Sequence, residues 1–299
     1  MKNHFSRRSF LQTTAISASA LMVPGISLAE EPGNKKYDFE LNKNPLKIGL
    51  MTYTLGKDWD IETIIKNCTE AEWKSVELRT THAHGVEITL NGAQRSEVKK
   101  RFQDSPLETI SLASACQYHS PDPAELKKNI EETKAFVILA QDIGATGIRV
   151  FPNAFVEGVD KEKTMKQIGK ALAEVGKFGH DHGVEIRVCV HGKGTNSVPV
   201  ISKIIDYSKS PYVYVNWNCD ASDTEGEGFI ANFNLVKDRI KGVHMHELTD
   251  PKYPYRLFFK LLSDAGYKGY CNAEVDQSCE PIRFMKYYRS LFLALQNAI

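Results

Sequence analysis

The stretch that decides the fold is Val184-Glu185-Ile186-Arg187-Val188-Cys189-Val190-His191, which lies between two glycines. Apolar residues alternate along it with charged or reactive ones. In a β-strand, successive side chains point to opposite faces of the sheet. Patterns of helical spacing precede it at 161–182 and follow it at 198–208. We therefore predict a strand whose apolar face packs against helices and whose other face is polar.

The same unit, a strand followed by a helix, recurs along the chain. The predicted strands are 46–55, 75–81, 108–117, 147–151, 184–191, 213–219, 242–247 and 269–275. The predicted helices are 61–71, 95–103, 124–143, 161–182, 198–208, 229–236, 254–265 and 281–298. Eight such units predict parallel strands in an α/β fold, closed into a single (β/α)8 TIM barrel over residues 45–299.

The first 44 residues precede this barrel. Ser6-Arg7-Arg8-Ser9-Phe10-Leu11 is a twin-arginine pattern, and the apolar run that follows ends in Ser27-Leu28-Ala29, small residues suited to a signal peptidase. We predict a twin-arginine signal peptide at 1–29, a flexible leader at 30–44 and a periplasmic protein. The apolar run is too short for a stable membrane span, so none is expected after cleavage.

Composition excludes some partners. The 38 Lys and Arg residues nearly balance the 37 Asp and Glu residues, for a formal net charge of +1. No nucleic-acid partner is therefore expected. The cysteines form no CxxC pair, and nothing in the sequence indicates the oligomeric state.

Polar residues gather at the ends of the predicted strands. The apolar faces must pack against the helices, so the polar positions face the barrel axis. Barrel enzymes hold their sites where the strands end. Buried polar pairing would account for one such residue, whereas a group of them favours a binding site. The residues at strand ends are Arg149, His191, Asn218, His244 and Glu274.

Three segments resemble the xylose isomerase-like barrel family, which includes sugar epimerases and apurinic endonucleases. They are Val184–Gly192, Val243-His244-Met245-His246-Glu247, and Gly266–Tyr270 leading to Glu274. The resemblance extends from residue 46 to about 295. It implies a small-molecule carbohydrate substrate.

The resemblance also implies a metal site, which in the family takes Glu, Asp, His and Glu. These positions fall on Cys189, Asn218, His244 and Glu274, and only the last two match. A divalent metal is predicted, Zn²⁺ if the thiolate binds and Mn²⁺ otherwise. The alternative is that no metal binds and that Glu274 hydrogen-bonds Arg149 or a substrate hydroxyl.

Further histidines follow the second and third strands, in Arg79–Gly85 and Cys116–His119. A histidine pKa near neutrality suits proton transfer, although loop capping explains such residues equally well. The predicted catalytic residues are Glu274, His191, Arg149 and His119. The predicted substrate-binding residues are His82, Gln117, His246 and Asn216.

These features predict an isomerase or epimerase that abstracts a proton next to a carbonyl, with or without a metal. Export disfavours sugar phosphates, so a non-phosphorylated sugar or keto-sugar is expected. One alternative is a lyase or hydrolase of keto-glycosides. Another is a non-catalytic sugar-binding protein, which the replacements at Cys189 and Asn218 would favour.

Overall fold

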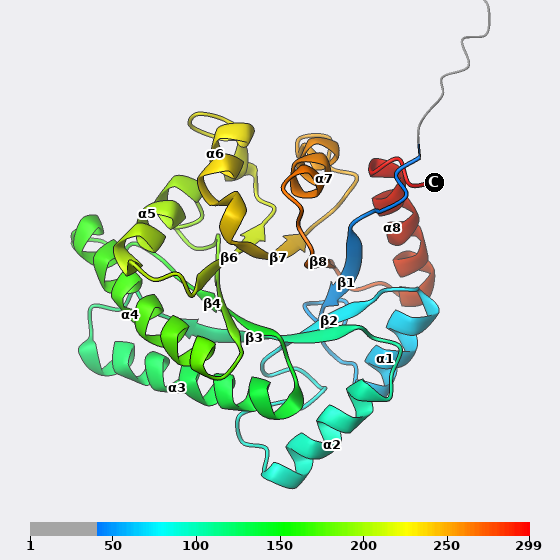
Figure 1. Cartoon of the computed structure of the whole chain (residues 1–299), viewed down its shortest axis with the longest axis horizontal. Coiled ribbons are helices and arrows are strands. Elements are labelled where there is room, and N and C mark those ends of the chain that lie inside the picture. Colours follow the sequence, from blue (N-terminus) through cyan, green and yellow to red (C-terminus); the bar gives the residue numbers. More distant parts are fainter. Residues whose placement is uncertain (1–40) are drawn as a thin grey trace, which may run out of the picture. The chain divides into compact units, whose positions relative to one another are not determined.

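The computed structural model describes residues 41–299, in which eight parallel strands close into one barrel, β1 to β8 in sequence order (Figure 1). The strands are β1 (Lys47–Met51), β2 (Ser75–Arg79), β3 (Thr109–Gln117), β4 (Gly147–Phe151), β5 (Glu185–Cys189), β6 (Val213–Asn218), β7 (Ile240–Met245) and β8 (Tyr270–Ala273). The predicted (β/α)8 fold is confirmed.

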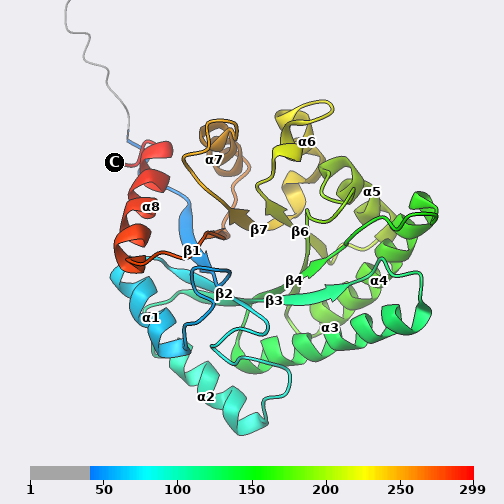
Figure 2. The same ribbon diagram turned by 180° about the vertical axis from the view of Figure 1, so that it is seen from behind.

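A helix follows each strand and packs outside the barrel, and α8 lies beside α1 in both views (Figures 1 and 2). The helices are α1 (Ile61–Glu70), α2 (Gly92–Gln103), α3 (Pro123–Ile143), α4 (Lys161–Asp181), α5 (Val198–Ser208), α6 (Phe229–Val236), α7 (Tyr255–Asp264) and α8 (Pro281–Leu295). None of the helices in residues 41–299 combines the length and apolar character that a bilayer span requires.

The predicted signal peptide and residues 30–40 of the predicted leader lie outside the described residues. The last residues of that leader contact the barrel domain, since the backbone N–H of Asn42 donates to the carbonyl of Asn297 at 2.8 Å.

Capping residues set the helix boundaries. Asp122 accepts a hydrogen bond from the backbone of Ala124, so α3 begins at the predicted place. Asn91 and Gln94 form a reciprocal capping box, which starts α2 at Gly92, three residues before the predicted start. Sequence periodicity alone misses this first turn because it carries no apolar residue that is buried.

The two faces of the strands follow the predicted parity. Outward residues such as Ile186 and Val188 are fully buried in the apolar layer between strands and helices. Inward positions include three glycines, Gly49, Gly147 and Gly242, where a Cβ would lie 2.1 to 2.7 Å from a polar side chain inside the barrel. The barrel interior is therefore filled by polar groups that glycine makes room for.

Several strands end earlier than predicted. β5 ends at Cys189, β7 at Met245 and β8 at Ala273. His191, His246 and Glu274 therefore lie just beyond the strand ends, at the mouth of the barrel. β7 also begins two residues earlier than predicted, at Ile240, where its pairing with β6 shifts register.

Candidate active site

The centre of the mouth is a chain of three ionisable groups. Nε2 of His244 lies 2.8 Å from Oε1 of Glu77, and Nδ1 of His244 lies 3.1 Å from Oε2 of Glu274. His244 lies on β7, Glu77 on β2 and Glu274 just beyond β8, and His244 and Glu77 are almost wholly buried. Since both ring nitrogens face carboxylates, both must donate, and the ring is an imidazolium.

Electrostatics supports this assignment. Burial disfavours the charged form of His244. The charge of Glu77 and the hydrogen bonds that His244 makes with its neighbours nevertheless raise the pKa of His244 well above the ordinary value. Burial likewise opposes ionisation of Glu274, yet the hydrogen bond and charge of His244, and then the charge of Arg149, lower its pKa to about 2. Glu274 is thus a stable carboxylate and a weak base.

Arg149, from β4, brings a second cation to the mouth. Nη1 donates to the carbonyl of Ser114 at 2.9 Å, and the guanidinium lies 3.9 Å from the ring centre of Phe151. The register shift in β3 after Ala113 brings the Ser114 carbonyl to this position. Nε is buried and has no hydrogen-bond partner within residues 41–299. Nη2 also makes no hydrogen bond within these residues but is not among the buried unpaired atoms, so it is the donor open to an incoming acceptor.

His191 follows β5 and is held by two amides. Nδ1 lies 3.0 Å from Oδ1 of Asn153, whose Nδ2 donates to Oε1 of Gln117 at 2.8 Å. This chain places the proton on Nδ1 and leaves the lone pair on Nε2. Gly192 adopts φ +99°, and a Cβ there would lie 2.7 Å from Asn153 Oδ1, so glycine is needed for this approach.

The same ring is neutral at neutral pH. Burial and then the charge of Arg149 lower the pKa of His191 below its ordinary value. Its face packs on Phe151, with ring centres 4.6 Å apart. An oriented neutral imidazole therefore lies next to a fixed guanidinium, and both contact the same phenyl ring.

The other predicted substrate-binding residues differ in position. His246 lies at the rim, with Nδ1 3.2 Å from the carbonyl of Glu274. His82 lies beyond β2, 3.2 Å from Nη1 of Arg79, and burial followed by that charge lowers its pKa to about 4. Asn216 is fully buried behind Cys189, with Nδ2 3.6 Å from the sulfur. Asn216 is therefore an interior residue rather than a rim residue.

His119 is not joined to this group. It lies in the loop after β3, where the nearest charge affecting it is Glu125 of α3. No hydrogen bond within residues 41–299 connects its side chain to Arg149, His191 or Glu274. Within residues 41–299, His119 is therefore outside the hydrogen-bond network of the mouth.

The predicted metal ligands lie around His244, which contacts Glu274 and Cys189 and pairs in register with Asn218, but they do not form a metal site. Within residues 41–299, no three His, Cys, Asp or Glu side chains are placed to hold an ion. Both nitrogens of His244 are taken up by carboxylates, so no lone pair remains for a metal. Cys189 is buried beside Asn216, and Asn218 offers at most a neutral oxygen. The donor set present does not fit the metal that the resemblance implied.

Two residues of the site are absent from the set predicted from the sequence. Glu77 shares the inward parity of β2, but nothing in its strand identifies His244 as its partner. Asn153 lies beyond β4, with a left-handed φ of 38°, in a segment without strand periodicity. The sequence feature that could have identified Asn153 is an asparagine directly after a strand end.

Comparison with known proteins agrees with this architecture. The model of the xylose isomerase-like TIM barrel family matches residues 65–288, so the chain belongs to that family. Among curated proteins, no sequence match is found.

Solved structures share the fold. An L-ribulose 3-epimerase has a TM-score of 0.71 at 16% identity, covering 85% of this chain and 95% of the other. A 3-keto-D-glucoside 4-epimerase from E. coli has a TM-score of 0.71 at 12% identity, covering 83% and 99%. A D-psicose 3-epimerase from Clostridium cellulolyticum, solved with D-tagatose, has a TM-score of 0.65 at 14% identity, covering 85% and 96%.

Proposed function

We propose that this protein is an isomerase or epimerase that acts on a non-phosphorylated keto-sugar by abstracting a proton next to the carbonyl. One observation carries the proposal: a neutral, oriented His191 lies at the same mouth as two fixed cations, Arg149 and His244. This combination suits enolate chemistry, since a histidine base must be unprotonated and positive charge stabilises the product oxyanion.

The roles follow from the geometry. Nε2 of His191 takes the proton, and the electrons of the C–H bond form a carbon–carbon double bond as the carbonyl oxygen becomes an enolate. The unpaired Nη2–H of Arg149 donates to that oxygen. Glu274 stays ionised and accepts a hydrogen bond from a sugar hydroxyl. Delivery of a proton to the opposite face of the same carbon gives the epimer. Delivery to the former carbonyl carbon, with transfer of the adjacent hydroxyl proton to the enolate oxygen, gives the isomer.

His244 acts through Glu274 as a positioning residue. Held between two carboxylates, it fixes the orientation of Glu274 and adds positive charge to a site whose predicted metal ligands are incomplete. No step in this scheme passes through a metal.

A lyase acting on keto-glycosides is the second candidate. A cavity of about 580 Å³ lies between the loops after β6 and β7 and is lined in part by His246, Asp220 and Tyr255. It adjoins the mouth and has room for an aglycone. The same proton abstraction would then expel the aglycone with its bonding electrons, and the neighbour that acts on a 3-keto-D-glucoside makes such a substrate class relevant.

Export by the twin-arginine route is part of the proposal and rests on Arg7 and Arg8, which lie outside the described residues. Cell fractionation tests it: the wild-type chain should reach the periplasm, and a variant with both arginines replaced by lysine should stay behind. A periplasmic double variant would contradict the proposed route.

The activity is tested by incubating keto-sugars and a 3-keto-glycoside with the protein in D2O and following the protons by NMR. We expect deuterium at the carbon next to the carbonyl, together with an epimer, an isomer or a released aglycone that identifies the reaction. Sugars that bind without any exchange would contradict the enzyme and leave sugar binding as the function.

A further inference from the structure

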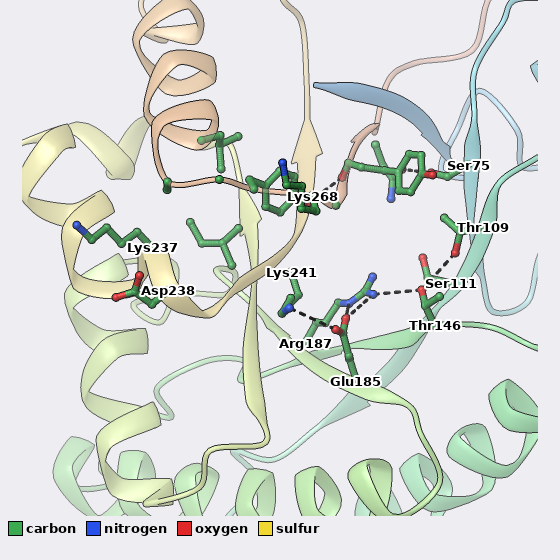
Figure 3. A pocket seen from close by; sticks show the side chains of 18 residues that line it. Ser75, Thr109, Ser111, Thr146, Glu185, Arg187, Lys237, Asp238, Lys241 and Lys268 are labelled. Carbon is green, nitrogen blue, oxygen red and sulfur yellow. Dashed lines mark hydrogen bonds and ion pairs between the residues drawn. The ribbon is translucent and has the colours of Figure 1, made fainter. Parts of the chain in front are cut away.

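A second cavity opens at the opposite end of the barrel, away from the mouth. It measures about 470 Å³ and is lined by residues at the starts of strands, among them Ser75, Thr109, Glu185 and Tyr270, and by the loop before β8 (Figure 3). Sites of barrel enzymes lie at the ends of the strands rather than at their starts. The proposed reaction therefore leaves this cavity without a role.

The cavity contains a buried arginine with one free edge. The side chain of Arg187 is only 9% exposed. Its Nε and Nη2 donate to Oε2 of Glu185 at 3.0 and 2.7 Å, and Nη2 also donates to Thr146. Nη1 makes no hydrogen bond within residues 41–299, and Figure 3 draws no contact to it. Nη1 is not among the buried unpaired atoms, so it faces the cavity, where an acceptor can reach it.

The surrounding backbone is built around this guanidinium. A Cβ on Gly147 would lie 2.7 Å from Nε of Arg187, and one on Gly242 would lie 3.5 Å from its Cδ. Gly147 and Gly242, which have no side chains, thus leave room for the Arg187 side chain. The free edge is held in a defined position rather than sampling many rotamers.

The lining also carries a surplus of positive charge. Arg187 is joined there by Lys237, Lys241 and Lys268, whereas the lining carboxylates are Glu185 and Asp238. Nζ of Lys241 lies 3.8 Å from Glu185, on the far side of the carboxylate that Arg187 binds. Four cationic side chains against two anionic ones favour an anion in the remaining space.

We propose that this cavity is a second binding site, which takes a small oxyanion of the phosphate or carboxylate class. Nη1 of Arg187 and Nζ of Lys241 donate to its oxygens, and Glu185 competes with it for Lys241. Arginine suits this ligand because its planar N–H groups match oxyanion geometry. The alternative occupant, water, would satisfy Nη1 but would give no saturable binding.

Calorimetric titration of the full chain tests the proposal, with inorganic phosphate in one series and acetate in the other, at low ionic strength. One equivalent should bind from at least one series, and that series identifies the class of oxyanion. Lys241→Ala, at a half-exposed position, should weaken binding about tenfold, as expected for one charge-assisted contact. Glu185→Gln should tighten binding, a gain that misfolding cannot produce.

Arg149→Gln is the matched control, because phosphate could also bind the guanidinium at the mouth. This variant should bind the anion as the wild type does. Absence of saturable binding in both series would overturn the proposal. So would binding that is lost in Arg149→Gln and retained in Lys241→Ala.

Discussion

The two ends of the barrel interior handle buried charge differently. At the mouth, His244 has a carboxylate at each ring nitrogen, and its side chain is 1% exposed. At the opposite end, Arg187 has one carboxylate, Glu185, whose side chain is 31% exposed, and one guanidinium edge faces a cavity. The charge of His244 is fixed between two protein partners, while Arg187 keeps one N–H donor free for a ligand.

This difference distinguishes a cation that positions neighbouring side chains from a cation that can bind a ligand. A cation that is paired on both sides cannot give a donor to a ligand, but it can fix the groups beside it. A cation paired on one side can still bind an anion. The following variants test whether the two ends differ in this way.

The largest effect should come from His191→Gln, which keeps a polar side chain at the mouth but removes the imidazole base. We expect the rate of deuterium exchange into a keto-sugar to fall by about 100-fold or more, the usual contribution of a positioned base. His182→Gln, at the end of α4, serves as the control and should exchange at the wild-type rate. An unchanged rate in His191→Gln would remove this residue from the mechanism.

Glu77→Gln and Glu185→Gln compare the two ends directly. Glu77 is fully buried against His244, so loss of its charge should lower the free energy of unfolding by about 3 kcal/mol. Glu185 is partly exposed, and its replacement should cost less than about 1 kcal/mol. Urea denaturation of both variants provides the measurement. Equal losses would mean that the two ion pairs are equivalent.

Asp223 is a buried carboxyl group that forms no ion pair within residues 41–299. It lies near the mouth in the short helix Ala221–Thr224, and Tyr253 donates to it at 2.7 Å. Burial raises its pKa from 3.8 to about 7. The folded state therefore holds a proton that the unfolded state releases, and the free energy of unfolding should fall as pH rises from about 4 to 7.

That fall should amount to roughly 3 kcal/mol. In Asp223→Asn, which cannot ionise, this part of the pH dependence should disappear from thermal melts recorded at pH 5 and pH 8. Parallel pH profiles in the wild type and the variant would show that Asp223 ionises normally.

The smallest effect is expected from chelation. Because both nitrogens of His244 face carboxylates, we expect EDTA treatment to leave the exchange rate and the melting temperature unchanged. Metal analysis of the purified protein should then find no stoichiometric Zn²⁺ or Mn²⁺. Activity that is lost with EDTA and restored by either ion would restore the metal-assisted prediction.

The sequence predicts the fold well because its signal is local. Alternation along β5 and the helical spacing beside it place each element within a few residues of its observed bounds. The inward direction of Arg149, His244 and Arg187 follows from the same parity. Helix starts are less certain where caps rather than apolar residues decide them, as at Gly92.

The partners of those inward residues are not predictable in this way. Glu77 and His244 are 167 residues apart and meet only because β2 and β7 face each other across a closed barrel. The alternation of side chains predicts which face of the sheet a residue occupies, but not how deep it lies or which side chain it meets. The sequence therefore predicts Asn216 as a substrate-binding residue, although it is buried inside the barrel. The contact between Asn153 and His191 depends on backbone angles at two loop residues, which strand periodicity does not encode.

The distance along the chain between Glu77 and His244 has a consequence for folding. An open barrel would leave both side chains in water, whereas the closed barrel, in which β8 pairs with β1, buries them against each other. Contacts of long sequence separation slow folding. Burial of this charge pair therefore depends on closure of the whole barrel.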